Sequence, residues 1–191
     1  MKQFVEVGDN VALKVAVLYG LQTTIRDALN ANPDSAYHVG TISWGRESFG
    51  EDEVRQTIIS FIEPPKPADI TVDSEFNTVR TYDWTVYAQG IIANSFDSPL
   101  LPAYELVAEI KTILAAQFDE RTGIAKNNIF NLGPAAQRSR NNKNNVFRIR
   151  LGSETVRGPG DHSRYTFFWL PIQFGLVEDI KSPRVTVQNP L

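Results

Sequence analysis

The strongest structural signal in the chain lies in 78-TVRTYDWTVYAQGIIANSFDSPLLPAYELVAEIKTILAAQF-118, where a strand pattern is followed by a helix pattern. In 78–92, large apolar side chains fall on one parity and polar side chains on the other, which predicts a half-buried strand. Gly90 interrupts this segment and indicates a bend or a bulge. The apolar parity comprises Tyr82, Trp84, Val86, Ala88 and Ile92.

The second half of this stretch predicts an amphipathic helix that ends near Phe118. Ser98 is expected to cap the helix, and Pro99 suits its first position. Glu105, Glu109 and Lys111 fall on the polar side. The apolar stripe comprises Ala103, Leu106, Val107, Ile110, Ile113, Leu114 and Phe118.

The flanking sequence adds one more helix and several strands. A helix is predicted over 11–31, with Asn10 as its N-cap and Asn32-Pro33-Asp34 as its stop. Its apolar stripe comprises Leu18, Leu21, Ile25, Ala28 and Leu29. Strands are predicted at 37–44, 54–62, 146–151 and 164–176, with a short one at 185–187. In 146–151, Phe147, Ile149 and Leu151 are expected on one face, with Arg148 and Arg150 on the other.

These elements predict an α+β fold: a mainly antiparallel β-sheet with two α-helices packed on one face, long loops and an extended C-terminal tail. The length of 191 residues suits a single domain, 1–191, with a basic arm at 119–145 and a tail at 177–191. The strand at 164–176 is apolar on both parities, which places it in the centre of the sheet or beneath a neighbouring subunit.

Charge is distributed unevenly along the chain. Residues 1–120 carry 8 Lys+Arg and 18 Asp+Glu, a net charge of −10, whereas residues 121–164 carry 9 and 2, a net charge of +7. The remaining 27 residues are balanced, which returns the overall −3. Such asymmetry indicates an electrostatic contact with nucleic acid or with an acidic protein face, the alternative being a solvated loop.

Two groups of residues are the candidate interface. In the basic segment, Lys and Arg side chains suit phosphate or carboxylate partners, but the only aromatic side chains among them are Phe130 and Phe147, which argues against sequence-specific stacking on bases. The acidic loop lacks the ligand pattern of a calcium site, so it is interpreted as a solvated loop or a docking patch. The basic group comprises Arg138, Arg140, Lys143, Arg148 and Arg150. The acidic group comprises Glu47, Glu51, Asp52 and Glu53.

Patterns typical of catalysis are not found in the sequence. The chain has no cysteine and two histidines, His38 and His162, so thiol chemistry and Cys-type zinc sites are excluded. Phosphate-binding glycine loops and the nucleophile elbow are not present either. No apolar run reaches the ~18 residues of a membrane span. We therefore predict a protein that is not an enzyme, binds no cofactor or metal and has no membrane partner.

Several local patterns resemble the tail-terminator, or tail-completion, proteins of long-tailed bacteriophages, the lambda-type family. The resemblance covers about half of the chain and leaves the extra segments 63–77 and 119–145 unassigned. It rests on Ile25-Arg26-Asp27-Ala28-Leu29, on Tyr82-Asp83-Trp84-Thr85-Val86-Tyr87, on the helix after Ser98-Pro99 and on Arg164-Tyr165-Thr166-Phe167.

The resemblance implies a structural role in the virion. Copies of such a protein form a ring, expected to be a hexamer, that caps the tail tube, stops its polymerisation and joins it to the head-side connector. The partners are then further copies, the tube protein and the connector, assembled in the host cytoplasm, and DNA passes through the ring without specific binding. The alternatives are another neck component, or a nucleic-acid-binding accessory protein that uses 121–150.

Overall fold

The computed structural model describes residues 4–33, 37–46, 57–64, 72–76, 79–93, 97–119, 121–122, 145–158 and 164–187, with the backbone alone at 72–76, 145 and 186. The two helices are α1 (Leu13–Ala31) and α2 (Leu101–Ala115). The strands are β1 (Asn10–Ala12), β2 (Val39–Trp44), β3 (Thr57–Ile62), β4 (Val72–Phe76), β5 (Val79–Ala93), β6 (Asn145–Leu151), β7 (Thr155–Arg157), β8 (Tyr165–Asp179) and β9 (Arg184–Thr186).

Two long strands form the centre of the main sheet. β5 and β8 pair antiparallel without interruption, from Val79 opposite Asp179 to Ala93 opposite Tyr165. The sheet order is β2-β3-β5-β8-β6, with β4 pairing along β5 beside β3, and β7 along β8 beside β6. Among the strand pairs that the structure describes, only β2 and β3 run parallel. The predicted α+β class with a mainly antiparallel sheet is therefore confirmed, and β8 is central as expected.

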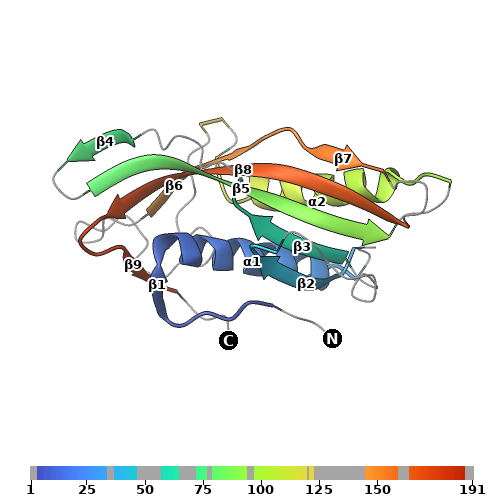
Figure 1. Cartoon of the computed structure of the whole chain (residues 1–191), viewed down its shortest axis with the longest axis horizontal. Coiled ribbons are helices and arrows are strands. Elements are labelled where there is room, and N and C mark those ends of the chain that lie inside the picture. Colours follow the sequence, from blue (N-terminus) through green and yellow to red (C-terminus); the bar gives the residue numbers. More distant parts are fainter. Residues whose placement is uncertain are drawn as a thin grey trace.

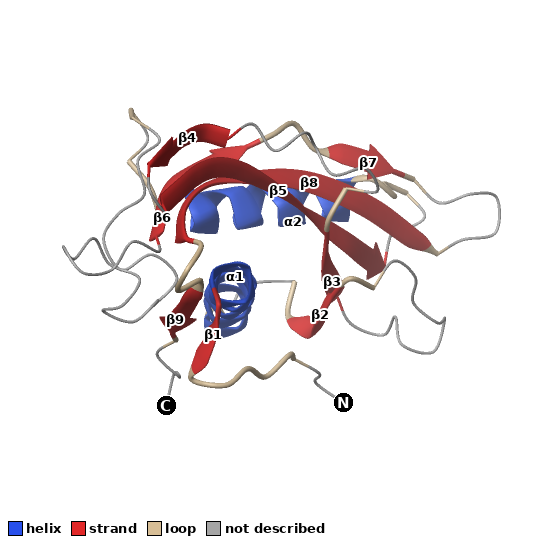
Figure 2. Cartoon of the chain, turned by 60° about the vertical axis from the view of Figure 1, so that its left-hand side comes forward, coloured by secondary structure: helices blue, strands red, loops and turns tan. Residues whose placement is uncertain are grey.

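Both helices pack on the concave face of the curved sheet. Figure 2 shows β5 and β8 arching over α2 and α1, and Figure 1 shows α1 lying beside the long strands. Alternation along the strands turns one parity of each toward the helices, and these residues form the main core. The fully buried members on β8 are Phe168, Leu170, Ile172, Phe174 and Leu176.

The first helix begins differently from the prediction. Asn10 belongs to β1 instead of capping α1, and Ala12 precedes the helix without a side-chain cap. The N–H of Leu13 donates instead to the carbonyl of Pro183, because β1 pairs with β9 from the C-terminal segment. The predicted stripe is buried at Leu21, Ile25 and Leu29 and half-buried at Leu18, but Ala28 in the last turns is exposed.

The second helix begins two residues later than predicted. Ser98 accepts a hydrogen bond from the N–H of Leu101 through its backbone carbonyl, so a turn precedes the helix, and Pro102 rather than Pro99 lies in the first helical positions. The helix ends at Ala115, and looser turns continue to Phe118. Five residues of the predicted stripe are buried: Ala103, Leu106, Val107, Ile110 and Leu114.

The strand predictions differ from the structure at two positions. A bend or a bulge was predicted at Gly90, and no bulge occurs there, because Gly90 lies opposite Phe168 in unbroken register. A bulge occurs instead between Val146 and Arg148 in β6, which takes Phe147 out of the alternation and lets Val146 enter the core.

The sheet is also more extensive than predicted. β8 continues to Asp179, so the first residues of the predicted 177–191 tail belong to the sheet, and β9 confirms the short strand in the rest. β4 and β7 were not expected, because each is short and gains its partners only through the central strands. Most of the predicted 119–145 arm lies outside the described residues.

Candidate interaction surfaces

The structure describes only part of the predicted interface. The four acidic-loop residues and Arg138, Arg140 and Lys143 lie outside the described residues, as does His162. Arg148 and Arg150 lie in β6. His38 is exposed just before β2.

Arg148 is engaged within the chain. Its Nη2 donates to both carboxylate oxygens of Asp83, at 2.7 and 2.9 Å, and its guanidinium lies 5.3 Å from the ring centre of Phe147. The Phe147 ring in turn packs where Gly175 leaves room, since a Cβ at Gly175 would meet that ring at 2.7 Å. The charge of Arg148 is thus neutralised on the sheet, whereas Arg150 on the same face is exposed.

A row of aromatic side chains lies on the outer face of the sheet, away from the helices. Tyr165, Phe167 and Trp169 alternate along β8 with the buried core residues and are half-buried. The rings of Phe167 and Trp169 stack, with centroids 6.4 Å apart and planes inclined by 17°. Tyr165 and Phe167 pack on Ile58 and Ile91, which form an apolar cluster separate from the main core. The outer face therefore carries its own apolar surface.

Exposed arginines border this aromatic row. Arg157 of β7 lies opposite Phe167 in the register, and Arg150 of β6 lies opposite Gln173, so both share the outer face. We name this surface, with Arg150, Arg157, Tyr165, Phe167 and Trp169, the basic-aromatic face. The sequence indicates the aromatic row, because both faces of 164–176 are apolar. It did not indicate β7, so the arginine that β7 places beside the row was not predicted.

A second exposed apolar surface lies at the start of α2. Leu100, Leu101 and Tyr104 are 39%, 55% and 47% exposed, so three large apolar side chains are exposed close together in the sequence. Asp97 and Glu105 are exposed in the same segment. We name these five residues the acidic-apolar end of α2. This surface was not predicted from the sequence. Leu101 lies outside the predicted apolar stripe of the helix, yet it is itself apolar.

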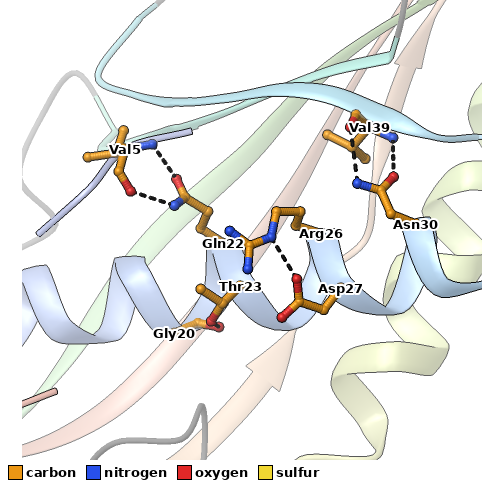
Figure 3. A network of polar contacts seen from close by, with 8 residues as sticks. All are labelled: Val5, Gly20, Gln22, Thr23, Arg26, Asp27, Asn30 and Val39. Atoms are coloured by element: carbon orange, nitrogen blue, oxygen red, sulfur yellow. Dashed lines mark hydrogen bonds and ion pairs between the residues drawn. The ribbon is translucent and has the colours of Figure 1, made fainter. Parts of the chain in front are cut away.

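Two side-chain amides of α1 act as partners for neighbouring backbone (Figure 3). Gln22, which is fully buried, donates to the carbonyl of Val5 at 2.7 Å and accepts from its N–H at 3.2 Å. Asn30 makes the same pair of bonds to Val39 at the start of β2. Arg26 lies 5.2 Å from the ring centre of Phe4. The N-terminal segment is thereby held along α1 without pairing to a strand there.

The titratable groups with shifted pKa values have structural causes. Burial, together with the Glu178 carboxylate that its hydroxyl contacts, raises the pKa of Tyr82. Burial followed by the charges of Glu105 and Glu109 raises the pKa of Tyr37. The hydrogen bond from Lys111 lowers the pKa of Glu154. Each group is thus explained by a contact within the fold.

Within the described part of the chain, no group of three or more His, Asp or Glu side chains is arranged to hold a metal ion. Neither described helix has the length and apolarity needed to cross a membrane. No protein-family model matches the chain, and no curated protein matches it either.

Proposed function

We propose that this chain is a non-enzymatic structural protein of a virion, a ring-forming tail terminator that caps a bacteriophage tail tube and joins it to the head-side connector. In this role it stops polymerisation of the tube protein, presents its other side to the connector, and leaves a passage for DNA that it does not bind specifically. Assembly takes place in the host cytoplasm, and the ring is expected to be a hexamer.

The observation that carries the proposal is the basic-aromatic face. Apolar rings on the open side of a sheet are costly in water and are typical of surfaces that another protein covers. The face is built largely on β8, which pairs with β5 along its length and with β6 and β7 on its other side. A partly apolar surface of this kind suits contact with another protein.

The charge distribution supports self-association over association with an unrelated acidic partner. The chain supplies both signs, −10 over residues 1–120 and +7 over 121–164, so adjacent copies can present opposite charges to one another. A closed ring uses such complementarity at every contact, because each copy offers one surface of each kind.

Electron microscopy of the purified protein tests this function. Negatively stained images are expected to contain rings of a single diameter with a central opening, and added tail tubes of the cognate virion should carry one ring at one end. Particles without rings, combined with tubes that keep growing in the presence of the protein, would contradict the proposal.

A nucleic-acid-binding accessory protein is the second candidate, and one observation favours it. Arg150 and Arg157 border stacked rings, and single strands bind where aromatic rings and cations occur together. Fluorescence anisotropy with a labelled single-stranded oligonucleotide separates the two. The tail-terminator proposal predicts little binding at physiological salt, whereas tight binding by a monomer, falling steeply with salt, would support the accessory role.

A further inference from the structure

We infer that neighbouring copies join head to tail: the acidic-apolar end of α2 on one copy docks on the basic-aromatic face of the next. This inference rests on the proposed self-assembly and names the two surfaces that perform it. The partner at each surface is a second copy of this chain.

The two surfaces lie on opposite sides of the two layers and adjoin at one edge, where Leu100 lies against Gly158, directly after Arg157. The side of α2 that packs beneath the sheet carries Ala103, Leu106 and Ile110, and Leu101 lies on the far side of the same helix. On β8, Phe168 and Leu170 point toward the helices, so Phe167 and Trp169 point away from them. A copy that stacks its α2 surface on the sheet of another copy therefore leaves its own sheet face available for a third.

The chemistry of the two surfaces is complementary. Around the aromatic row, Arg148 and Asp83 neutralise each other, and the exposed charges described there are Arg150, Arg157 and Arg164, which directly precedes Tyr165. The first turns of α2 expose Asp97 and Glu105 beside Leu101 and Tyr104. Apolar groups would meet apolar groups, and carboxylates would meet guanidinium groups, which also form the stronger kind of hydrogen bond.

A hydrogen bond and a packing contact join the start of α2 to β7 and β8, the strands that carry most of the basic-aromatic face. The hydroxyl of Thr166 on β8 donates to the carbonyl of Pro99 at 2.5 Å. Gly158, directly after β7, leaves space for Leu100, since a Cβ there would lie 3.1 Å from a methyl group of Leu100. Preorganised surfaces lose less entropy on association.

A second copy fits better than a different protein, because the chain itself supplies both halves of the contact. Two unlike complementary surfaces on opposite sides of the two layers generate a head-to-tail interface, which closes into a ring when the rotation per copy allows it and otherwise gives a filament. A ring is the outcome that a tail terminator requires.

Charge exchange between the two surfaces tests the contact. One variant carries Asp97→Lys and Glu105→Lys, and the other carries Arg150→Glu and Arg157→Glu. Each alone places like charges at every contact, so the concentration at half-assembly, measured by sedimentation velocity, should rise on the order of 100-fold. An equal mixture of the two variants should assemble again, because opposite charges then meet in alternating copies.

Matched controls change the same charges elsewhere. Glu6→Lys and Lys181→Glu lie on exposed residues outside both surfaces and should assemble like the wild type. Circular dichroism checks that each variant is folded. If a charge variant fails to fold, Leu101→Ala combined with Tyr104→Ala weakens the same contact by removing exposed side chains alone.

The outcomes separate this contact from the proposed function. Restored assembly in the mixture, with neither variant assembling alone, supports the contact. A wild type that assembles while both charge variants assemble equally well overturns the contact and leaves self-assembly intact. A wild type that stays monomeric at every concentration and forms no ring on added tail tubes overturns both.

Discussion

At the residue scale, single side chains take over tasks that backbone pairing usually performs. Gln22 and Asn30 each bind both polar groups of one residue in an extended segment, as a neighbouring strand would. The hydrogen bonds of Gln22 could not be predicted from its place in an apolar helical stripe, because its partner, Val5, lies 17 residues away. Buried amides of this kind are satisfied locally and specify where the extended segment lies.

Replacing Gln22 with methionine should release the N-terminal segment. The volume is nearly kept, but the N–H and carbonyl of Val5 lose their partner, so the free energy of unfolding should fall by about 1–3 kcal/mol. Hydrogen exchange should show faster exchange at Val5, while Gln117→Met, at a half-buried position after α2, should leave it unchanged. Unaltered protection at Val5 would show that Gln22 does not hold the segment.

Glycine is required at position 90 because of a neighbouring side chain and not because of its backbone conformation. A Cβ at this position would lie 2.0 Å from the ring of Phe168, which is fully buried and has no room to withdraw. Gly90→Ala should therefore lower the free energy of unfolding by about 1–3 kcal/mol in urea denaturation. Gly8→Ala, with nothing within 4 Å, is the neutral control. A double variant with Phe168→Leu should lose less than the sum of the two, and full additivity would contradict the clash.

Trp84 is the largest side chain of β5 in the core. It is 7% exposed, its ring lies 5.8 Å from that of Phe174, and its Nε1 donates to Glu63 at 3.1 Å. Trp84→Ala should cost about 3–5 kcal/mol in thermal or urea unfolding, whereas Trp84→Phe should keep most of the stability. A loss near zero for the alanine variant would mean that the ring contributes nothing to the core.

At the element scale, α2 is tied to the edge of the sheet by an ion pair. Lys111 on α2 contacts Glu154, which lies between β6 and β7, and both side chains are partly exposed. The contact links the helix to the short strand that borders the basic-aromatic face. It should therefore hold β7 in place as much as it stabilises the whole fold.

Lys111→Met should reduce stability in a pH-dependent way. Because Lys111 lowers the pKa of Glu154 in the folded chain, its contribution is present above 4.5, the ordinary value for this carboxyl, and is lost as the pH falls through the lowered value. We expect the variant to be less stable at pH 7 by about 0.5–1 kcal/mol and equal to the wild type near pH 2. Urea denaturation at both pH values measures this, with Lys181→Met as the control. A difference that stays constant with pH would exclude the ion pair as its cause.

Long elements were predictable from sequence, whereas of the described strands of three to five residues only β9 was. The buried face of 79–93 can be read from the alternation of apolar and polar residues, since fifteen residues supply enough repeats to identify it. β1, β4 and β7 span three to five residues, and each depends on pairing with a partner strand: β1 with β9 from the far end of the chain, β4 with β5, and β7 with β8. The predicted start of α1 was wrong for the same reason: the carbonyl of Pro183, distant in the sequence, replaces a local cap.

At the scale of the whole molecule, the fold is a two-layer structure with an apolar surface on each outer side. The rings of β8 lie on the sheet side, and Leu101 and Tyr104 lie on the helix side. The sequence indicated the first through the two apolar parities of one strand. It could not indicate the second, because exposure of α2 depends on which neighbours surround it. The two predicted interface arginines of β6 also differ in environment: Asp83 neutralises Arg148, whereas Arg150 is exposed.

The most direct test of the account is the mass of the wild-type protein in solution. Sedimentation velocity over a concentration series should show the 21.4 kDa chain giving way to a single closed species, with six copies as the expected size. That species should depend little on further increases in concentration, as a closed ring does and a filament does not. A chain that sediments as a monomer over the whole series would contradict the claim that it works by binding copies of itself.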